Sequence, residues 1–145
     1  ERPVTFLFGA NRDKELRPEM ELILDFTPRV VLVQSQHPKA TPLADLAAQF
    51  AQIAAERPAG TAAQVVAAPS MTAAIAAANE LTPPGGLLVG SGSVFVAAEL
   101  REAWNSLHPG LFPADDWVHA AAGEPVLVPP QPPAQPTVEP GSSHG

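Results

Sequence analysis

The chain has 145 residues, 46% of them hydrophobic, which is enough apolar material for one domain core and too little length for two ordinary domains. Fifteen Asp and Glu outnumber eight Lys and Arg and give a formal charge of -7. That balance argues against nucleic-acid binding and against docking on an anionic membrane surface. The absence of Cys excludes a disulfide scaffold and a thiolate zinc site, and no apolar run reaches the length of a membrane-spanning helix. We therefore expect a cytoplasmic protein without a membrane segment.

The chain alternates between two hydrophobic periods. Short apolar runs typical of buried strands occur at residues 4–8, 30–33, 64–67 and 87–89. Each is followed by apolar residues at helical spacing, in the segments 16–24, 42–57, 71–81 and 96–107. Strand and helix in alternation predict an α/β fold, with a Rossmann-like, mostly parallel sheet of four to six strands and helices on both faces.

Several residues mark where these elements begin and end. Thr41 is the expected N-cap of the second helix, with Pro42 at its first position, where no N–H donor is needed. Ser70 is expected to cap the third helix, and Pro83 to Gly86 form a turn. The sequence His108 to Gly110 is expected to end the fourth helix.

The C-terminal region has a different composition. Seven of the eighteen prolines fall within residues 123–145, which we interpret as an extended, Pro-rich tail following an α/β domain at residues 1–122. At the other end, Glu1 is not an initiator Met, so we expect the chain to be a piece of something longer.

Ligands of parallel sheets bind at the carboxyl ends of the strands. Here those ends are the segments 9–14, 34–41, 68–70 and 90–93. The candidate site residues in them are Asp13, Lys14, Lys39, Gly92 and Ser93, with Asn11, His37 and Ser91 as secondary candidates.

Each candidate also has a plain structural interpretation. Asp13 either holds a hydroxyl or a cation at a site, or caps the following helix. His37 is either functional or part of a solvated loop, because one His without a second ligand is weak evidence for metal or proton transfer. The segment Gly90 to Ser93 either meets an anion with the N–H groups of the next helix or is a tight turn with a serine cap. No Ser–His–Asp or paired-carboxylate arrangement is evident, so we name no catalytic residue and no metal ligand.

Three motifs, in this order, carry a family resemblance. They are Phe6-Leu7-Phe8-Gly9 with Asp13-Lys14, then Val30 to Val33 followed by Pro38-Lys39, then Leu88 to Arg101 with its Gly92-Ser93 pair and its Glu-x-Arg ending. Together they make the segment Val4 to Trp104 resemble the C-terminal domain of folylpolyglutamate synthase and dihydrofolate synthase, members of the Mur ligase superfamily. Two positions depart from the family pattern, because Glu15 replaces an Asp and Lys39 replaces an Arg, which loses a bidentate donor.

The resemblance implies an ATP-dependent ligase. In such an enzyme an N-terminal P-loop domain binds ATP and Mg²⁺ and phosphorylates the carboxylate of a folate. The amino group of L-glutamate then attacks the acyl phosphate. The C-terminal domain closes over the cleft between the domains, which Asp13, Lys14, Lys39, Gly92 and Ser93 are expected to face.

Several parts of such an enzyme are missing from this sequence. This chain has no P-loop and lacks the family's Asp-Gly-Ala-His-Asn strand and the helix after it. We therefore expect it to be inactive alone and to bind no cofactor alone. Its partner would be the N-terminal domain of the same chain, with folate and glutamate as substrates, in a monomeric enzyme. The alternatives left open are a stand-alone module that binds a small anion at residues 90–93 and a protein-interaction domain that uses the Pro-rich tail.

Overall fold

The computed structural model describes residues 2–13, 15–58 and 62–110, all within Glu1–Phe112, the first of the two units of the chain. The elements in chain order are β1 (Val4–Gly9), α1 (Arg17–Phe26), β2 (Arg29–Leu32), α2 (Leu43–Glu56), β3 (Gln64–Ala67), α3 (Met71–Leu81), β4 (Leu87–Gly92) and α4 (Val94–Leu107). The predicted α/β class is confirmed. Lys14, the expected boundary at residue 122 and the tail at 123–145 lie outside the described residues.

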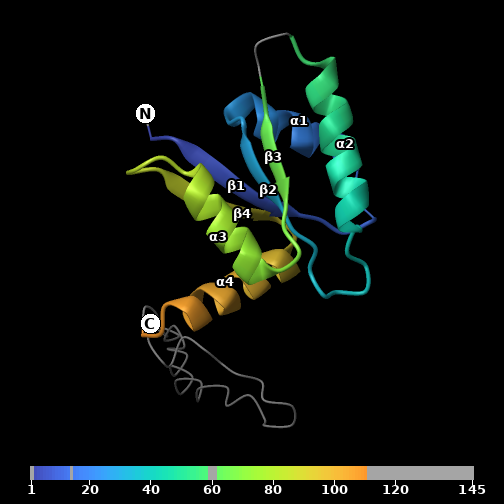
Figure 1. The fold of residues 1–145 in the computed structure, drawn as a ribbon. Helices are drawn as coiled ribbons and strands as arrows, with labels where there is room; N and C mark the ends of the chain where they lie inside the picture. The colour runs from blue at the N-terminus through green and yellow to red at the C-terminus, as the bar shows by residue number, and fades with distance from the viewer. Residues whose placement is uncertain (1, 14, 59–61, 111–145) are drawn as a thin grey trace, which may run out of the picture. The chain divides into compact units, whose positions relative to one another are not determined.

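The strands form one parallel sheet in the order β3-β2-β1-β4 (Figure 1). The chain therefore builds outward from β1 through β2 to β3, then crosses back to place β4 on the other side of β1. In open parallel sheets this reversal creates a crevice at the carboxyl ends of the two strands that flank it. In this chain those strands are β1 and β4.

The helices cover both faces of the sheet, as predicted (Figure 1). Because side chains alternate along a strand, Phe8 of β1 contributes to the core on one face, while Leu7 contributes to the core on the other. The first core lies under α1 and α2 and includes Phe8 and Phe50, whose rings meet edge to face with centroids 5.7 Å apart. The second lies under α3 and α4, and includes Ile75 and Leu100.

The fourth strand is longer than predicted. Residues 90–92 belong to β4, although the sequence placed them in a loop, and Gly92 pairs with Gly9 at the end of the ladder. Two glycines make this possible. A Cβ on Gly92 would lie 2.0 Å from the Gly9 carbonyl oxygen, and its φ of 111° is one that other residues rarely adopt. The glycines that suggested a loop instead allow two strands to pair to their ends.

The helix caps agree with the sequence in part. Ser70 caps α3 as predicted, with its hydroxyl accepting from the N–H of Ala73. The prediction for Thr41 is wrong: Pro42 is the N-cap residue of α2, and the Leu43 N–H donates to the side-chain oxygen of Gln34. The Gln34 amide reaches this N–H from the loop after β2, a long-range contact that local capping rules do not include.

The proposed capping role of Asp13 is also not seen. Helix α1 begins at Arg17 with Leu16 as its N-cap and no capping side chain, so Asp13 is too far upstream to serve it. Pro18 lies in the first turn, where the sequence analysis allowed it.

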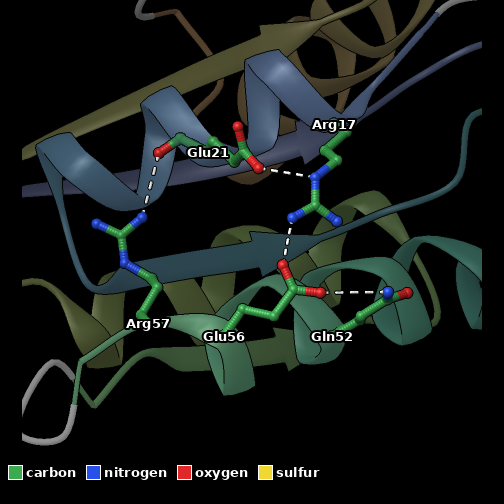
Figure 2. Close-up of polar contacts among 5 residues, drawn as sticks. All are labelled: Arg17, Glu21, Gln52, Glu56 and Arg57. Carbon is green, nitrogen blue, oxygen red and sulfur yellow. Dashed lines mark hydrogen bonds and ion pairs between the residues drawn. The ribbon is translucent and has the colours of Figure 1, made fainter.

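Polar contacts join α1 to α2 on the surface (Figure 2). Arg17 pairs with both Glu21 of its own helix and Glu56 of α2, and the Arg57 side chain donates to the main-chain oxygen of Glu21. The hydrogen bond to Arg17 lowers the pKa of the Glu56 carboxyl, and the same contact raises the pKa of Arg17. This network closes the outer side of the first core. Among the described residues, no helix is both long and apolar enough to cross a bilayer.

Candidate functional site

The carboxyl ends of β1 and β2 are joined beyond the sheet by main-chain hydrogen bonds. The N–H of Thr41 donates to the oxygen of Ala10 at 2.8 Å, and the N–H of Arg12 donates to the oxygen of Lys39 at 2.9 Å. These two bonds flank an antiparallel bridge between Asn11 and Ala40. Two loops far apart in sequence, one carrying Asn11 and the other carrying Lys39, are thereby held side by side.

The Arg12 side chain strengthens this junction. Its Nε donates to the Ala40 oxygen at 3.1 Å, so the guanidinium lies against the second loop. Arg12 and the exposed Lys39 therefore bring two cationic side chains to one edge of an acidic protein. Each of these two side chains attracts anions, while Asp13, next to Arg12, adds a carboxylate to the same loop.

Two buried oxygens in this region have no hydrogen-bond partner among the described residues. They are Oδ1 of Asn11 and Oγ1 of Thr41. A buried acceptor without a partner costs free energy and calls for an explanation, such as a ligand, a water or a contacting domain. Asn11 was a secondary candidate from the sequence, whereas Thr41 was assigned only a capping role.

The start of α4 is joined to the end of β1. The N–H of Ser93 donates to the Gly9 oxygen at 3.1 Å, and the buried Ser93 hydroxyl accepts from the N–H of Val96 at 3.2 Å. Ser93 is thus the N-cap of α4, as the structural interpretation predicted. An anion at this helix start would meet the N–H groups of Val94 and Phe95, since those of Ser93 and Val96 already have partners within the chain.

The loop after β2 also contacts α4. The main-chain N–H of Gln36 donates to both carboxylate oxygens of Glu99, at 2.9 and 3.2 Å. The ring of His37 stacks on that of Phe95, with centroids 3.8 Å apart and planes 15° from parallel. Sequence reasoning missed Phe95 and Glu99 as parts of this site. Their spacing of four residues, one helical turn, is the only local signal, and it does not identify the loop they contact.

The structure therefore brings most candidates to one edge. Asn11, Lys39, Gly92 and Ser93 lie at the ends of three segments that hydrogen bonds connect, and His37 joins them through Phe95. Asp13 is in an exposed turn directly after Arg12, and Ser91 lies within β4, paired with Phe8. Lys14 lies outside the described residues.

A polar cavity of about 490 Å³ adjoins this edge between the loop after β2 and the start of α3. Its lining includes Gln34, Ser35, Ser70, Thr72 and Glu99. Glu99 adds a carboxylate to this lining, and both of its oxygens accept the main-chain N–H of Gln36. In the part of the chain that the structure describes, no cluster of three or more His, Asp or Glu side chains could hold a metal ion.

Comparisons of the chain with protein-family models, with curated proteins and with solved structures found no match. The support for a function therefore comes from the structure itself: the order of the strands, the two loops that hydrogen bonds join, and the side chains of Arg12 and Lys39 at their edge.

Proposed function

We propose that this chain is most of the C-terminal domain of an ATP-dependent ligase that adds L-glutamate to folate. The observation that carries the proposal is spatial. The three motifs that carry the resemblance lie far apart in sequence, yet the ends of β1, β2 and β4 bring them to one edge. That edge lies at the point where the strand order reverses, which is where open parallel sheets bind ligands.

The chemistry of the proposed reaction suits a cationic edge. The upstream domain would hold ATP and Mg²⁺ and phosphorylate the folate carboxylate, and the glutamate amine would displace phosphate to give an amide, ADP and phosphate. ATP, the acyl phosphate and glutamate all carry negative charge. Arg12 and Lys39 would attract them, and closure of the domain would exclude water from the reactive acyl phosphate.

The described residues of this chain supply binding and positioning groups. Lys39 contributes a point charge where the family has an Arg, so it would contact a carboxylate or phosphate through fewer fixed hydrogen bonds. The unpartnered Oδ1 of Asn11 would accept a hydrogen bond from a substrate or from the upstream domain.

An open edge of the sheet is consistent with an incomplete domain. In the sheet β4 is the last strand, with β1 as its neighbour and no described strand on its other side. Leu87 is 48% exposed there. An apolar groove of about 410 Å³, lined by residues that include Leu88, Leu100 and Trp104, runs alongside. Parallel sheets are normally covered on both faces, and their edges are paired or protected. An additional strand and helix from upstream would satisfy both needs.

The two alternatives receive less support. A stand-alone anion-binding module at residues 90–93 would rely on donors of which two, the N–H groups of Ser93 and Val96, already have partners. An interaction domain would rely on the Pro-rich tail, which lies outside the described residues. We therefore favour the ligase, and place it in the cytoplasm as a monomer.

The direct test is the activity of the intact gene product. Purified full-length protein should form ADP only when folate and glutamate are both present, and the present chain alone should form none. A full-length protein without a P-loop, or one that forms no ADP under these conditions, would overturn the proposal.

A matched pair of variants tests the position of Ser93. Ser93→Ala and Ser70→Ala each remove a hydroxyl that caps one helix, so their structural costs should be similar, about 1 kcal/mol. In the full-length enzyme, Ser93→Ala should raise the KM for glutamate more than the KM for ATP, and should raise the KM for glutamate more than Ser70→Ala does. Equal effects of the two variants would remove Ser93 from the glutamate site.

A further inference from the structure

Helix α4 contacts the loop after β2 at two consecutive residues. Glu99 accepts the main-chain N–H of Gln36, and Phe95 stacks on the ring of His37. Phe95 and Glu99 lie one turn apart and so share a face of α4. The stack is close and nearly parallel, so it fixes the plane of the His37 ring as well as its position.

The His37 ring in turn holds the main chain of Lys39. Its Nδ1 accepts the N–H of Lys39 at 3.2 Å. On the other side, the Lys39 oxygen accepts from the N–H of Arg12. An Nδ1 that accepts a hydrogen bond carries no proton, so this contact requires the ring proton to be on Nε2. The main chain of Lys39 is thus bonded on both sides, by the first loop and by a ring that α4 supports.

We propose that His37 is a positioning residue. Its ring, stacked on Phe95, fixes the main chain of Lys39 and so directs the Lys39 amine across the edge of the sheet. His37 acts through Lys39 and makes no contact with substrate. The role of Lys39 in catalysis rests on the proposed ligase function, whereas the coupling of Phe95, His37 and Lys39 does not. Helix α4, which follows the Gly92-Ser93 pair, thereby sets the main-chain position of Lys39 through Phe95 and His37.

The coupling is measurable in the present chain by NMR. The ¹⁵N shifts of the His37 ring should report a protonated Nε2 and an unprotonated Nδ1. Phe95→Ala should speed hydrogen exchange of the Lys39 amide about two- to tenfold, the range expected when one hydrogen bond loses its support. Val94→Ala changes the adjacent residue, which is 75% exposed, and is the matched control that should leave the rate unchanged.

Two substitutions of His37 separate the ring from the acceptor. His37→Phe keeps a ring that can stack and removes Nδ1, so the Lys39 amide should exchange faster. His37→Asn removes the ring but keeps an acceptor near the position of Nδ1, so it should restore part of the protection. An unchanged Lys39 rate in Phe95→Ala and His37→Phe, or the opposite tautomer, would overturn the coupling.

The functional part is tested in the full-length enzyme with a double-mutant cycle. His37→Phe and Lys39→Ala should each lower kcat/KM, and the double variant should lose little more than Lys39→Ala alone. Losses that multiply would show that His37 acts independently of Lys39 and would overturn its positioning role. If the full-length protein has no ligase activity while the Lys39 amide still responds to Phe95→Ala, the proposed function fails and the coupling stands.

Discussion

The pairing of β1 and β4 to their last residues predicts that Gly92 is the least replaceable glycine of the site. In Gly92→Ala, the new Cβ would lie 2.0 Å from the Gly9 oxygen, and the φ of 111° would be strained for alanine. Backbone strain of this kind costs about 1 to 3 kcal/mol. Relieving the overlap by moving a strand end costs about as much again. The smaller entropy of the unfolded alanine chain returns up to about 1 kcal/mol, so we expect a net loss of about 1 to 6 kcal/mol, with a middle value of about 3 kcal/mol.

Gly85 provides the matched control. It also has a positive φ, 77°, but a Cβ there would meet nothing within 4 Å. Gly85→Ala therefore carries the backbone strain without the steric overlap, and should cost about 1 kcal/mol or less after the same entropic return. The difference between the free energies that the two variants lose therefore measures the cost of the steric overlap between β1 and β4.

Urea unfolding of the two variants, followed by tryptophan fluorescence, measures the difference. With a slope of about 1 to 3 kcal/mol per molar urea, Gly92→Ala should shift the midpoint by about 1 M or more, and Gly85→Ala by much less. Hydrogen exchange of the Ser93 amide, which donates to Gly9, should accelerate in Gly92→Ala alone. Equal midpoints for the two variants would refute the argument that Gly92 is required by the pairing.

Two further predictions concern stability. Thr41→Val should be neutral or stabilising by up to about 1 kcal/mol in urea unfolding, because it replaces a buried hydroxyl that has no partner among the described residues. Ser70→Ala removes a hydroxyl that caps α3 and should cost about 1 kcal/mol. If Thr41→Val lost as much stability as Ser70→Ala, Thr41 would have the capping role after all. Since Arg17 lowers the folded-state pKa of Glu56, the stability from this pair should be fully present above the ordinary Glu pKa and should be lost as the pH falls through the lowered value. The midpoint difference between the wild type and Glu56→Gln, followed from neutral pH to about pH 3, should shrink over that window, and a constant difference would contradict it.

The sequence was sufficient for the class of fold and for the segments that meet at one edge of the sheet. Buried parallel strands such as β2 contain continuous apolar runs, here Val30 to Leu32, and helices show a 3.6-residue period, so local pattern predicts both. Once the strands are known to be parallel, their carboxyl ends must lie at one edge. The candidate segments were therefore identified without knowledge of the strand order.

The side-chain contacts at that edge could not be predicted from the local sequence pattern. The cap of α2 comes from Gln34, nine residues before Leu43 at the start of the same loop, so no rule about neighbours of Thr41 would predict it. The stack of His37 on Phe95 joins residues 58 positions apart in sequence. Gly90 and Gly92 were misassigned to a loop because glycine is typical both of turns and of strands that approach each other closely, and only the pairing with β1 decides between them.

The edge is assembled mainly by main-chain atoms. The bonds from Thr41 to Ala10, from Arg12 to Lys39 and from Ser93 to Gly9 each join two main-chain groups, so they form with almost any side chain at those positions. The exposed side chain of Lys39 is therefore not needed to bring the loops together. Surface substitutions of this kind change stability by less than about 0.5 kcal/mol. Under the proposed function, a large loss of ligase activity in full-length Lys39→Ala, with unfolding unchanged, would then measure the contribution of the Lys39 amine to binding or catalysis, because the fold would be the same in both proteins.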